Sequence, residues 1–340
     1  MSKFSYVYVL TSKTGDTYYE QTLVSAISLR SHMPQANIIL VVDDKTNESL
    51  IGNRAEIKKY VSSVMAITLP NSLTNLQKSR WMKTSLPQYI SEDFLYIDSD
   101  TIITSSLEEI ETVNVELGAI LDRHQRFGNH CLKDIITENA KKLKFVPAVN
   151  DMHFNGGVIL VRKNERNIEF FKKWHSLWLD SAKKGLSIDQ IALAQANYLM
   201  GGLIQELPGE WNCQVENGTK FLYKAKILHM LVAGERHADR KPHELMKSQF
   251  YREIEKNGIT ASTIETINDP LSFFKTKTQI IGDGAVDFYN TTLCRTFCLL
   301  YSNKKTRKLF DVFNGLTNLI MKLKRKPVGA YSKIKKVEKL

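Results

Sequence analysis

The chain has 340 residues, of which 43% are hydrophobic and 24% charged, and its formal net charge is +11. This length and composition suit one large globular domain with an appendage, and they exclude a disordered chain. The start of the chain is not apolar and no run approaches the ~18 apolar residues of a membrane span, so we expect a cytoplasmic protein.

The first hundred residues alternate between strand and helix patterns. Apolar runs predict buried strands at residues 6–10, 38–42 and 94–97, with a short strand at 64–69. Apolar residues spaced by threes and fours predict helices within residues 19–29, 50–60 and 76–89. This alternation indicates a parallel sheet with right-handed crossovers. The first strand is not followed by Gly-x-Gly-x-x-Gly, which argues against a dehydrogenase.

Two aspartates, Asp98 and Asp100, directly follow the strand predicted at residues 94–97. In an open α/β sheet, ligands bind outside the carboxyl ends of the strands. Two carboxylates one residue apart can share a divalent cation and the diphosphate that it neutralises. The pattern favours a nucleotide-sugar site, although an Asp-x-Asp triplet alone fits a solvated loop or a helix cap.

The second half of the predicted sheet carries further polar residues. Residues 118–122 predict a strand that ends in a carboxylate, and the polar stretch at 123–151 predicts loops and a short helix above the site. Residues 154–161 then predict an apolar strand that begins with Asn155, Gly156 and Gly157. The glycines permit close approach of the backbone to a ligand, or they mark a bulge or tight bend. Asn155 offers an amide to sugar hydroxyls.

In their order along the chain, these motifs resemble glycosyltransferase family 8. The resemblance covers roughly residues 4–235 and implies a GT-A fold, an open mixed α/β sheet that is mostly parallel and flanked by helices. It also implies a nucleoside-diphosphate sugar donor, a divalent metal that is usually Mn²⁺ or otherwise Mg²⁺, and transfer with retention of anomeric configuration. The motifs that carry it are Asp98-Ser99-Asp100, Phe154-Asn155-Gly156-Gly157-Val158, Asp189-Gln190, Leu207-Pro208, Trp211-Asn212 and His229.

The resemblance also implies roles for individual residues. Asp98, Asp100 and His229 would hold the metal, and Asp98 would also contact the ribose of the donor. Asp189, Gln190 and Asn155 would form the catalytic part of the site, with Gln190 beside an oxocarbenium-like transition state. Asp189 alone also fits the cap of the apolar helix that follows it. Trp211 and Asn212 are candidates for lining the acceptor sugar, and Trp211 fits the core equally well.

The donor's phosphates require cationic partners. Lys78 and Arg80, on the helix before the Asp98 strand, are the candidates, because both side chains bind anionic oxygens and arginine does so bidentately. A solvated helix face explains them equally well. Beyond His229 the family's His-x-x-Gly with a following Lys-Pro is altered, because the next glycine is Gly234 and Lys241-Pro242 comes later.

The end of the chain is strongly basic. From Asn303 onward 12 cations face two anions, so this tail carries +10 of the net charge and the remaining 302 residues are close to neutral. Its apolar residues, spaced by threes and fours, predict an amphipathic helix that lies on an anionic membrane surface. A helix packed on the catalytic domain explains the pattern equally well. We do not expect nucleic acid as a partner, because the tail lacks a groove-reading motif.

Together these patterns predict a catalytic domain at residues 1–245, a helical extension at 246–302 and the basic amphipathic tail at 303–340. We expect a hexosyltransferase that moves a sugar from a UDP-sugar to a glycan or glycolipid in bacterial lipopolysaccharide or capsule synthesis, peripheral on the inner face of the plasma membrane. Two alternatives remain open. One is a sugar-phosphate nucleotidyltransferase, for which residues 10–15 form a poor phosphate loop, and the other is a noncatalytic membrane-associated binding protein.

Overall fold

The structure is a computed structural model that describes residues 4–186, 188–232, 244–272, 288–289 and 291–324. It divides into two compact units, Met1–Thr278 and Gln279–Leu340. We call the first, which contains the predicted catalytic domain, the catalytic unit and the second the C-terminal unit, and we describe each by itself. The possible phosphate-binding segment with Gly234 and Lys241-Pro242 lies outside the described residues.

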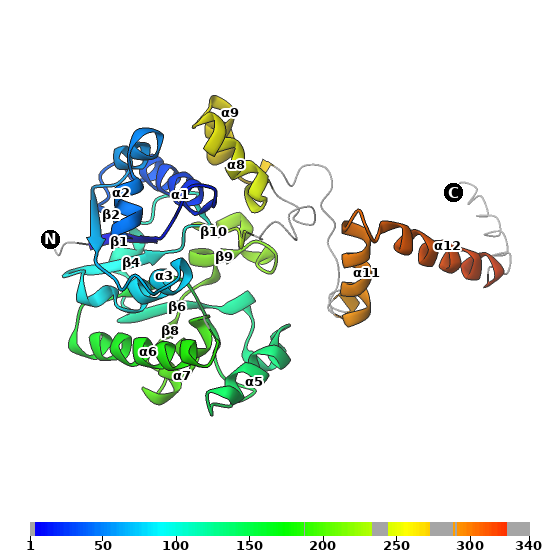
Figure 1. Cartoon of the computed structure of the whole chain (residues 1–340). Helices are drawn as coiled ribbons and strands as arrows, with labels where there is room; N and C mark the ends of the chain where they lie inside the picture. Colours follow the sequence, from blue (N-terminus) through cyan, green and yellow to red (C-terminus); the bar gives the residue numbers. More distant parts are fainter. Residues whose placement is uncertain (1–3, 187, 233–243, 273–287, 290, 325–340) are drawn as a thin grey trace, which may run out of the picture. The chain divides into compact units, whose positions relative to one another are not determined.

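The catalytic unit is built on a seven-stranded sheet (Figure 1), as the sequence predicts. The strand order is β3-β2-β1-β4-β7-β6-β8. Neighbouring strands run parallel except that β7 is antiparallel to both β4 and β6, so the sheet is open, mixed and mostly parallel. The strands are β1 Phe4–Leu10, β2 Ile38–Asp43, β3 Ser63–Ile67, β4 Asp93–Ile97, β6 Leu117–Leu121, β7 Phe154–Val161 and β8 Gln205–Glu206.

Helices cover both faces of this sheet, because successive side chains of a strand point to opposite faces. Tyr6 and Tyr8 of β1 pack in one buried cluster with α1, whereas Val7 and Val9 pack in another with α3, α6 and α7. Helices α8 and α9 join the α1 side. The helices are α1 Tyr18–His32, α2 Asp44–Ser49, α3 Asn75–Thr84, α4 Glu109–Thr112, α5 Lys133–Lys142, α6 Glu165–Lys183, α7 Gln190–Leu199, α8 Ser248–Asn257 and α9 Ala261–Asn268.

Several connections are short 3-10 helices. The helix predicted within residues 50–60 is one of them, and only Ile57 of its residues Gly52–Lys59 is buried, so no apolar stripe holds it against the core. The 3-10 helices are η1 Gly52–Lys59, η2 Leu86–Gln88, η3 Asp122–His124, η4 Phe127–Asn129, η5 Gly209–Asn212, η6 Thr219–Lys224 and η8 Glu244–Met246.

A small second sheet brings distant parts of the chain together. Strand β10, Ile227–His229, pairs antiparallel with β5, Thr101–Ile103, and parallel with β9, Cys213–Gln214. In this register His229 lies opposite Thr101, the residue that follows Asp100. The backbone N–H of Met230 donates to the Asp100 carbonyl at 2.8 Å. The small sheet therefore places His229 next to the two aspartates that end β4.

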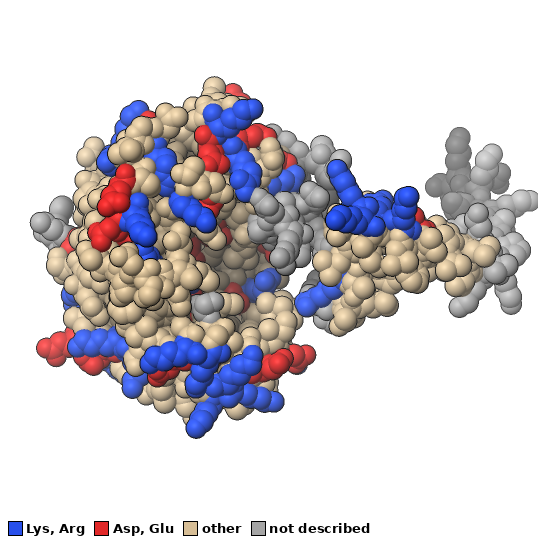
Figure 2. All heavy atoms as spheres, in the orientation of Figure 1, with Lys and Arg blue, Asp and Glu red and all other residues tan. Residues whose placement is uncertain are grey.

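The described residues of the C-terminal unit include two long helices, α11 Thr292–Ser302 and α12 Arg307–Lys324. Aromatic rings join them, with Phe297 against Phe310 and Phe313 at 6.3 and 5.6 Å between centroids. The helix expected in the basic tail is thus present. Figure 2 shows cations gathered at the start of α12 and uncharged side chains along much of the rest. Its exposed large apolar residues are Leu309, Val312, Phe313, Leu316, Leu319 and Ile320.

None of the described helices combines the length and the apolar character that crossing a membrane requires.

Candidate active site

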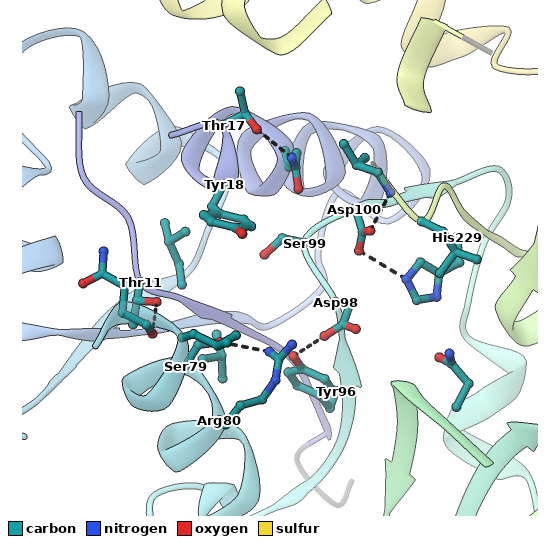
Figure 3. A pocket seen from close by; sticks show the side chains of 18 of the residues that line it. Thr11, Thr17, Tyr18, Ser79, Arg80, Tyr96, Asp98, Ser99, Asp100 and His229 are labelled. Carbon is teal, nitrogen blue, oxygen red and sulfur yellow. Dashed lines mark hydrogen bonds and ion pairs between the residues drawn. The ribbon is translucent and has the colours of Figure 1, made fainter. Parts of the chain in front are cut away.

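A cavity of about 370 Å³ lies where the parallel strands β1 and β4 end. Much of its wall comes from the end of β1 with Thr11, the start of α1 with Tyr18, helix α3 with Arg80, and the loop after β4 with Asp98. Residues of β7, α7, β10 and α8 complete it. Figure 3 shows these side chains around one space, with His229 on the side opposite Thr11. The edge of the sheet predicted to bind a ligand is therefore hollow.

The three residues expected to hold a metal converge in this cavity. One ligand atom from each of Asp98, Asp100 and His229 lies within 4.8 Å of the other two. Two carboxylates and an imidazole are donors that suit Mn²⁺ or Mg²⁺ together with phosphate oxygens. The described residues therefore fit the divalent cation that the resemblance implies, and the donor set does not by itself select one metal.

Asp98 is fixed by its neighbours on β4 and β7. The hydroxyl of Tyr96 donates to its Oδ1 at 2.5 Å, and its backbone N–H donates to the Gly157 carbonyl at 2.7 Å. The ammonium of Lys83 lies 3.6 Å from the same Oδ1. The other carboxylate oxygen is the one nearest the space above Gly157. Oδ1 is thus occupied by protein partners, while Oδ2 faces the space above Gly157 that His229 also borders.

Asp100 lies between His229 and the chain that follows β10. Its Oδ1 is 3.2 Å from Nε2 of His229, and its Oδ2 accepts the N–H of Val232 at 3.0 Å. Burial alone raises the pKa of Asp100, but the nearby imidazole and these hydrogen bonds outweigh it and lower the pKa to about 2. Burial lowers the pKa of His229, and Asp100 raises it by more. The carboxylate is therefore held ionised, as a metal ligand must be.

The backbone near this pair adopts an uncommon conformation. Leu231 has a φ of 49°, a left-handed conformation that is rare for a bulky residue without glycine's freedom. It lines the cavity and directs the next residue, Val232, back toward Asp100. Strain of this kind persists where the surrounding structure fixes it, often at functional sites.

Gly156 and Gly157 lie at an irregularity of β7. The pairing of β6 with β7 shifts register between Ala119 and Ile120. Ala119 pairs with Ile159 of β7, whereas the next residue, Ile120, pairs with Asn155. A Cβ on Gly157 would lie 2.4 Å from Cε1 of His229 and 2.8 Å from Oδ2 of Asp98, whereas one on Gly156 would meet the Lys83 ammonium at 3.2 Å. Gly157 therefore leaves room for the side chains of Asp98 and His229. The bulge also changes the direction of this part of β7.

The two cations expected to meet the donor's phosphates lie in different surroundings. Arg80 lines the cavity, with its Nε 3.0 Å from Oδ1 of Asp189. Lys78 instead forms a buried ion pair with Asp43 at the end of β2, 2.7 Å between Nζ and Oδ2, and is not among the described residues that line the cavity. Its position on α3 thus gives it a partner inside the protein.

Lys83 is the cation that the sequence reading missed. Its buried ammonium lies 3.3 Å from Oδ2 of Asp189, 3.6 Å from Oδ1 of Asp98, and 5.1 Å from the Tyr96 ring centre. The signal was present, because Lys83 follows Arg80 by three residues and side chains three apart share a helix face.

Asp189 and Gln190 stand at the start of α7 with different surroundings. Asp189 occupies the cap position without a side-chain cap bond, and its buried carboxylate lies between Arg80 and Lys83. Burial raises its pKa, but the two cations outweigh burial and lower it. Gln190 lines the cavity, and its Nε2 lies 3.2 Å from Nε2 of the buried His153.

Asn155 and Asn212 meet behind the metal cluster. Asn155 lines the cavity and is 6% exposed, whereas Asn212 is fully buried and lies 2.9 Å from Nδ1 of His229. Trp211 is also buried, in the core cluster on the α1 side of the sheet. Neither residue of the Trp211-Asn212 pair is among the described residues that line this cavity, and their role toward an acceptor sugar stays a prediction.

A family model described as glycosyl transferase family 8 matches residues 9–232. The solved galactosyltransferase LgtC, in complex with donor and acceptor sugar analogs, is 17% identical over 77% of this chain and 99% of its own, with a TM-score of 0.47. Mouse xyloside xylosyltransferase 1 is 15% identical over 66% of this chain and 97% of its own, with a TM-score of 0.44. GlyE of Streptococcus pneumoniae TIGR4 is 19% identical over 82% of this chain and 67% of its own, with a TM-score of 0.45. No curated protein matches the chain.

Proposed function

The chain belongs to glycosyl transferase family 8, and on this premise we propose that it transfers a hexose from a UDP-sugar to a glycan or glycolipid with retention of anomeric configuration. One observation carries the proposal. Asp98, Asp100 and His229, which are distant in sequence, converge on a cavity that Arg80 also lines. Acidic metal ligands opposite a guanidinium are the surroundings that a nucleoside diphosphate with its cation requires.

The proposed reaction breaks the bond between the anomeric carbon and the diphosphate and forms one from that carbon to an acceptor hydroxyl, whose proton is lost. A cation held by Asp98, Asp100 and His229, Mn²⁺ or Mg²⁺, would supply positive charge for the departing diphosphate. Arg80, which lines the cavity, and Lys83, buried beside Asp98 and Asp189, add positive charge near the departing diphosphate. These groups are already placed before the substrate binds.

The residues on the sugar side would have distinct roles in this proposal. The carboxylate of Asp189 is engaged by Arg80 and Lys83, so it orients the two cations and is a poor candidate for a nucleophile. Gln190 and Asn155 line the cavity and present neutral amides, which suit hydrogen bonds to sugar hydroxyls near the reacting carbon. No carboxylate is assigned to a double displacement, and attack from the face that the diphosphate leaves would not need one.

We also propose that the C-terminal unit binds an anionic membrane and so brings the enzyme to a lipid-linked acceptor, in lipopolysaccharide or capsule synthesis. Exposed cations, Lys304, Lys305 and Lys308, adjoin the exposed apolar side chains of α12. Such a combination binds anionic lipid surfaces by charge and by burial of apolar area.

A thermal-shift screen tests the donor and the metal together. We expect UDP with Mn²⁺ to raise the melting temperature by several degrees, since saturation at 100 times Kd adds about 2.7 kcal/mol. EDTA should abolish the rise, and a panel of UDP-sugars should then identify the donor by release of UDP. An equal shift with EDTA present would contradict the metal assignment. Release of pyrophosphate from an NTP and a sugar phosphate would instead support a nucleotidyltransferase.

A further inference from the structure

A chain of buried hydrogen bonds connects His229 to a carboxylate that does not touch the cavity's metal cluster. It begins at His130, passes through Asp122, Asn155 and Asn212, and ends at Nδ1 of His229. The successive distances are 2.8, 2.8, 3.0 and 2.9 Å. All five side chains belong to buried residues. Each amide in the chain has a fixed orientation, because its partners allow only one.

The donor and the acceptor of each hydrogen bond in this series can be assigned by starting from His130. The backbone N–H of Leu132 donates to Nδ1 of His130 at 3.1 Å, so the proton of that ring lies on Nε2 and is donated to Asp122. Burial raises the pKa of Asp122, but the bonds from His130 and Asn155 outweigh burial and hold that pKa well below its usual range. An ionised carboxylate only accepts, so Asn155 donates to it through Nδ2.

The orientation of Asn155 has an independent check. Its Oδ1 accepts the backbone N–H of Gly157 at 2.8 Å, and a backbone amide cannot reverse its role. The same Oδ1 therefore accepts from Nδ2 of Asn212 at 3.0 Å. This turns Oδ1 of Asn212 toward His229, where an amide oxygen can only accept. The proton must therefore lie on Nδ1 of His229.

From this geometry we propose that Asp122, Asn155 and Asn212 act as positioning residues that hold a proton of His229 on Nδ1. Nε2, which lies 3.2 Å from Oδ1 of Asp100 in this structure, is then the ring nitrogen that would bind the metal. The inference rests on the proposed function, in which His229 is a metal ligand. Histidines that bind metals commonly donate their second ring N–H to a carboxylate or carbonyl, which fixes ring orientation and tautomer. Here the carboxylate acts through two amides.

The series of hydrogen bonds joins side chains from elements that are distant in the sequence. Asp122 follows β6, Asn155 lies in β7, Asn212 ends η5 and His229 ends β10. The bulge at Gly156 and Gly157 places the amide of Asn155 toward Asp122 on one side and Asn212 on the other. Asn155 keeps one N–H of its Nδ2 beyond the bond to Asp122, so its proposed contact with the sugar remains compatible with the positioning role.

The first test measures Mn²⁺ affinity by electron paramagnetic resonance in the presence of UDP. Asn212→Leu removes the amide next to His229, and we expect the dissociation constant to rise about 10–100-fold. Asp122→Asn keeps the shape at the far end and should cause a smaller rise in the same direction. The control is Asn167→Leu, which removes a buried amide on α6 that bonds backbone carbonyls at 2.8 Å. It should leave Mn²⁺ affinity unchanged within about twofold.

The second test reads the proton directly by ¹⁵N NMR of the histidine rings. We expect Nδ1 of His229 to be protonated in the metal-free protein and in the complex with Mg²⁺ and UDP. An unprotonated Nδ1 would overturn the proposal whether or not metal binds. Unchanged Mn²⁺ affinity in both Asn212→Leu and Asp122→Asn, with wild type binding normally, would also overturn it. Failure of wild type to bind Mn²⁺ with UDP would instead refute the proposed metal site.

Discussion

The two units of the chain use charge in opposite ways. In the catalytic unit the charged groups of the cavity lie against partners at fixed distances, such as Asp100 with His229 and Arg80 with Asp189. In the C-terminal unit, cations such as Lys304 and Lys305 are exposed beside apolar side chains. The fixed distances between the charged groups of the cavity determine what they can bind. The exposed cations of the C-terminal unit instead act through their total charge. Single substitutions should therefore be severe in the cavity and mild on the tail.

The largest effect on turnover is expected from Asp100→Asn. The amide keeps the size of the side chain but removes the charge that would hold the cation, so turnover should fall by about 10² or more. Circular dichroism on the same sample should show an intact fold. The same change at the exposed Asp180 of α6 should leave turnover unaltered. Wild-type turnover by Asp100→Asn, with Mn²⁺ still required, would contradict the ligand assignment.

Gly157→Ala tests how closely the cavity's groups are packed. Its Cβ would lie 2.4 Å from His229 and 2.8 Å from Asp98, so one of the proposed ligands must move. We expect turnover to fall by at least about tenfold, since small misplacements of catalytic groups cost up to about 10²-fold. Gly156→Ala is the comparison variant, because its Cβ would lie 3.2 Å from Nζ of Lys83 and 3.8 Å from Oδ2 of Asp189 without crowding a proposed metal ligand, so we expect a smaller loss. Equal losses in both variants would show that the bulge, not the ligand spacing, matters.

Variants of Lys83 and Lys78, both on α3, compare an ion pair beside the proposed metal ligands with an ion pair that we expect to be structural. Lys83→Met should lower turnover by about 10-fold, because it removes a cation that lies beside Asp98 and Asp189. Lys78→Met leaves Asp43 buried without its cation, which should lower the free energy of unfolding by about 3–5 kcal/mol. Turnover per folded molecule should persist in Lys78→Met. Denaturant unfolding and turnover on both variants give the answer, and a reversed pattern would place the donor's phosphates near Lys78.

Glu20 is an exception among the buried charges of the catalytic unit. Its Oε2 has no hydrogen-bond partner among the described residues, and burial, with a contribution from Glu255, raises its pKa to about 7. Because this pKa lies above the unfolded value of about 4.3, the folded state loses stability as pH rises from about 4 to 7. Glu20→Gln should remove that loss and raise the melting temperature at pH 8 but not at pH 4. An equal rise in melting temperature at both pH values would show that the charged form of Glu20 does not destabilise the folded state.

Deleting residues 324–340 should have the smallest effect on turnover. It removes seven of the tail's cations without touching the exposed apolar residues of α12, and each cation near an anionic leaflet contributes up to about 1 kcal/mol. Sedimentation with anionic liposomes should show a sharp loss of binding, more so at low salt. Turnover on a soluble acceptor analogue should hardly change. If turnover is lost instead, the tail belongs to the catalytic machinery.

The sequence predicted the sheet, and the structure brings together the three side chains, Asp98, Asp100 and His229, that were predicted to share a metal. The strands were visible because both faces of the sheet are covered, which makes each central strand a continuous apolar run. Asp98 and Asp100 were visible because they directly follow one of these runs. The pairing of His229 with Asp100 needed the family resemblance, since no local pattern connects residues that the small sheet β5-β10-β9 brings together.

The partners of individual side chains were not predictable in the same way. Lys78 and Lys83 have the same chemistry and lie on one helix, and only the fold shows that the first meets Asp43 and the second Asp98. Asn212 was predicted as a candidate for lining the acceptor sugar, and its contact with His229 was not foreseen. Its role depends on three segments meeting behind His229, and single-sequence patterns carry no information on such contacts.

The central claim is that a divalent cation is held by Asp98, Asp100 and His229 for the donor's diphosphate. The most direct test is a count of bound Mn²⁺ by electron paramagnetic resonance, with UDP present, in wild type and in an Asp98→Asn, Asp100→Asn double variant that circular dichroism shows to be folded. We expect about one Mn²⁺ per wild-type chain and none in the double variant. Equal Mn²⁺ binding by the two proteins would contradict the account.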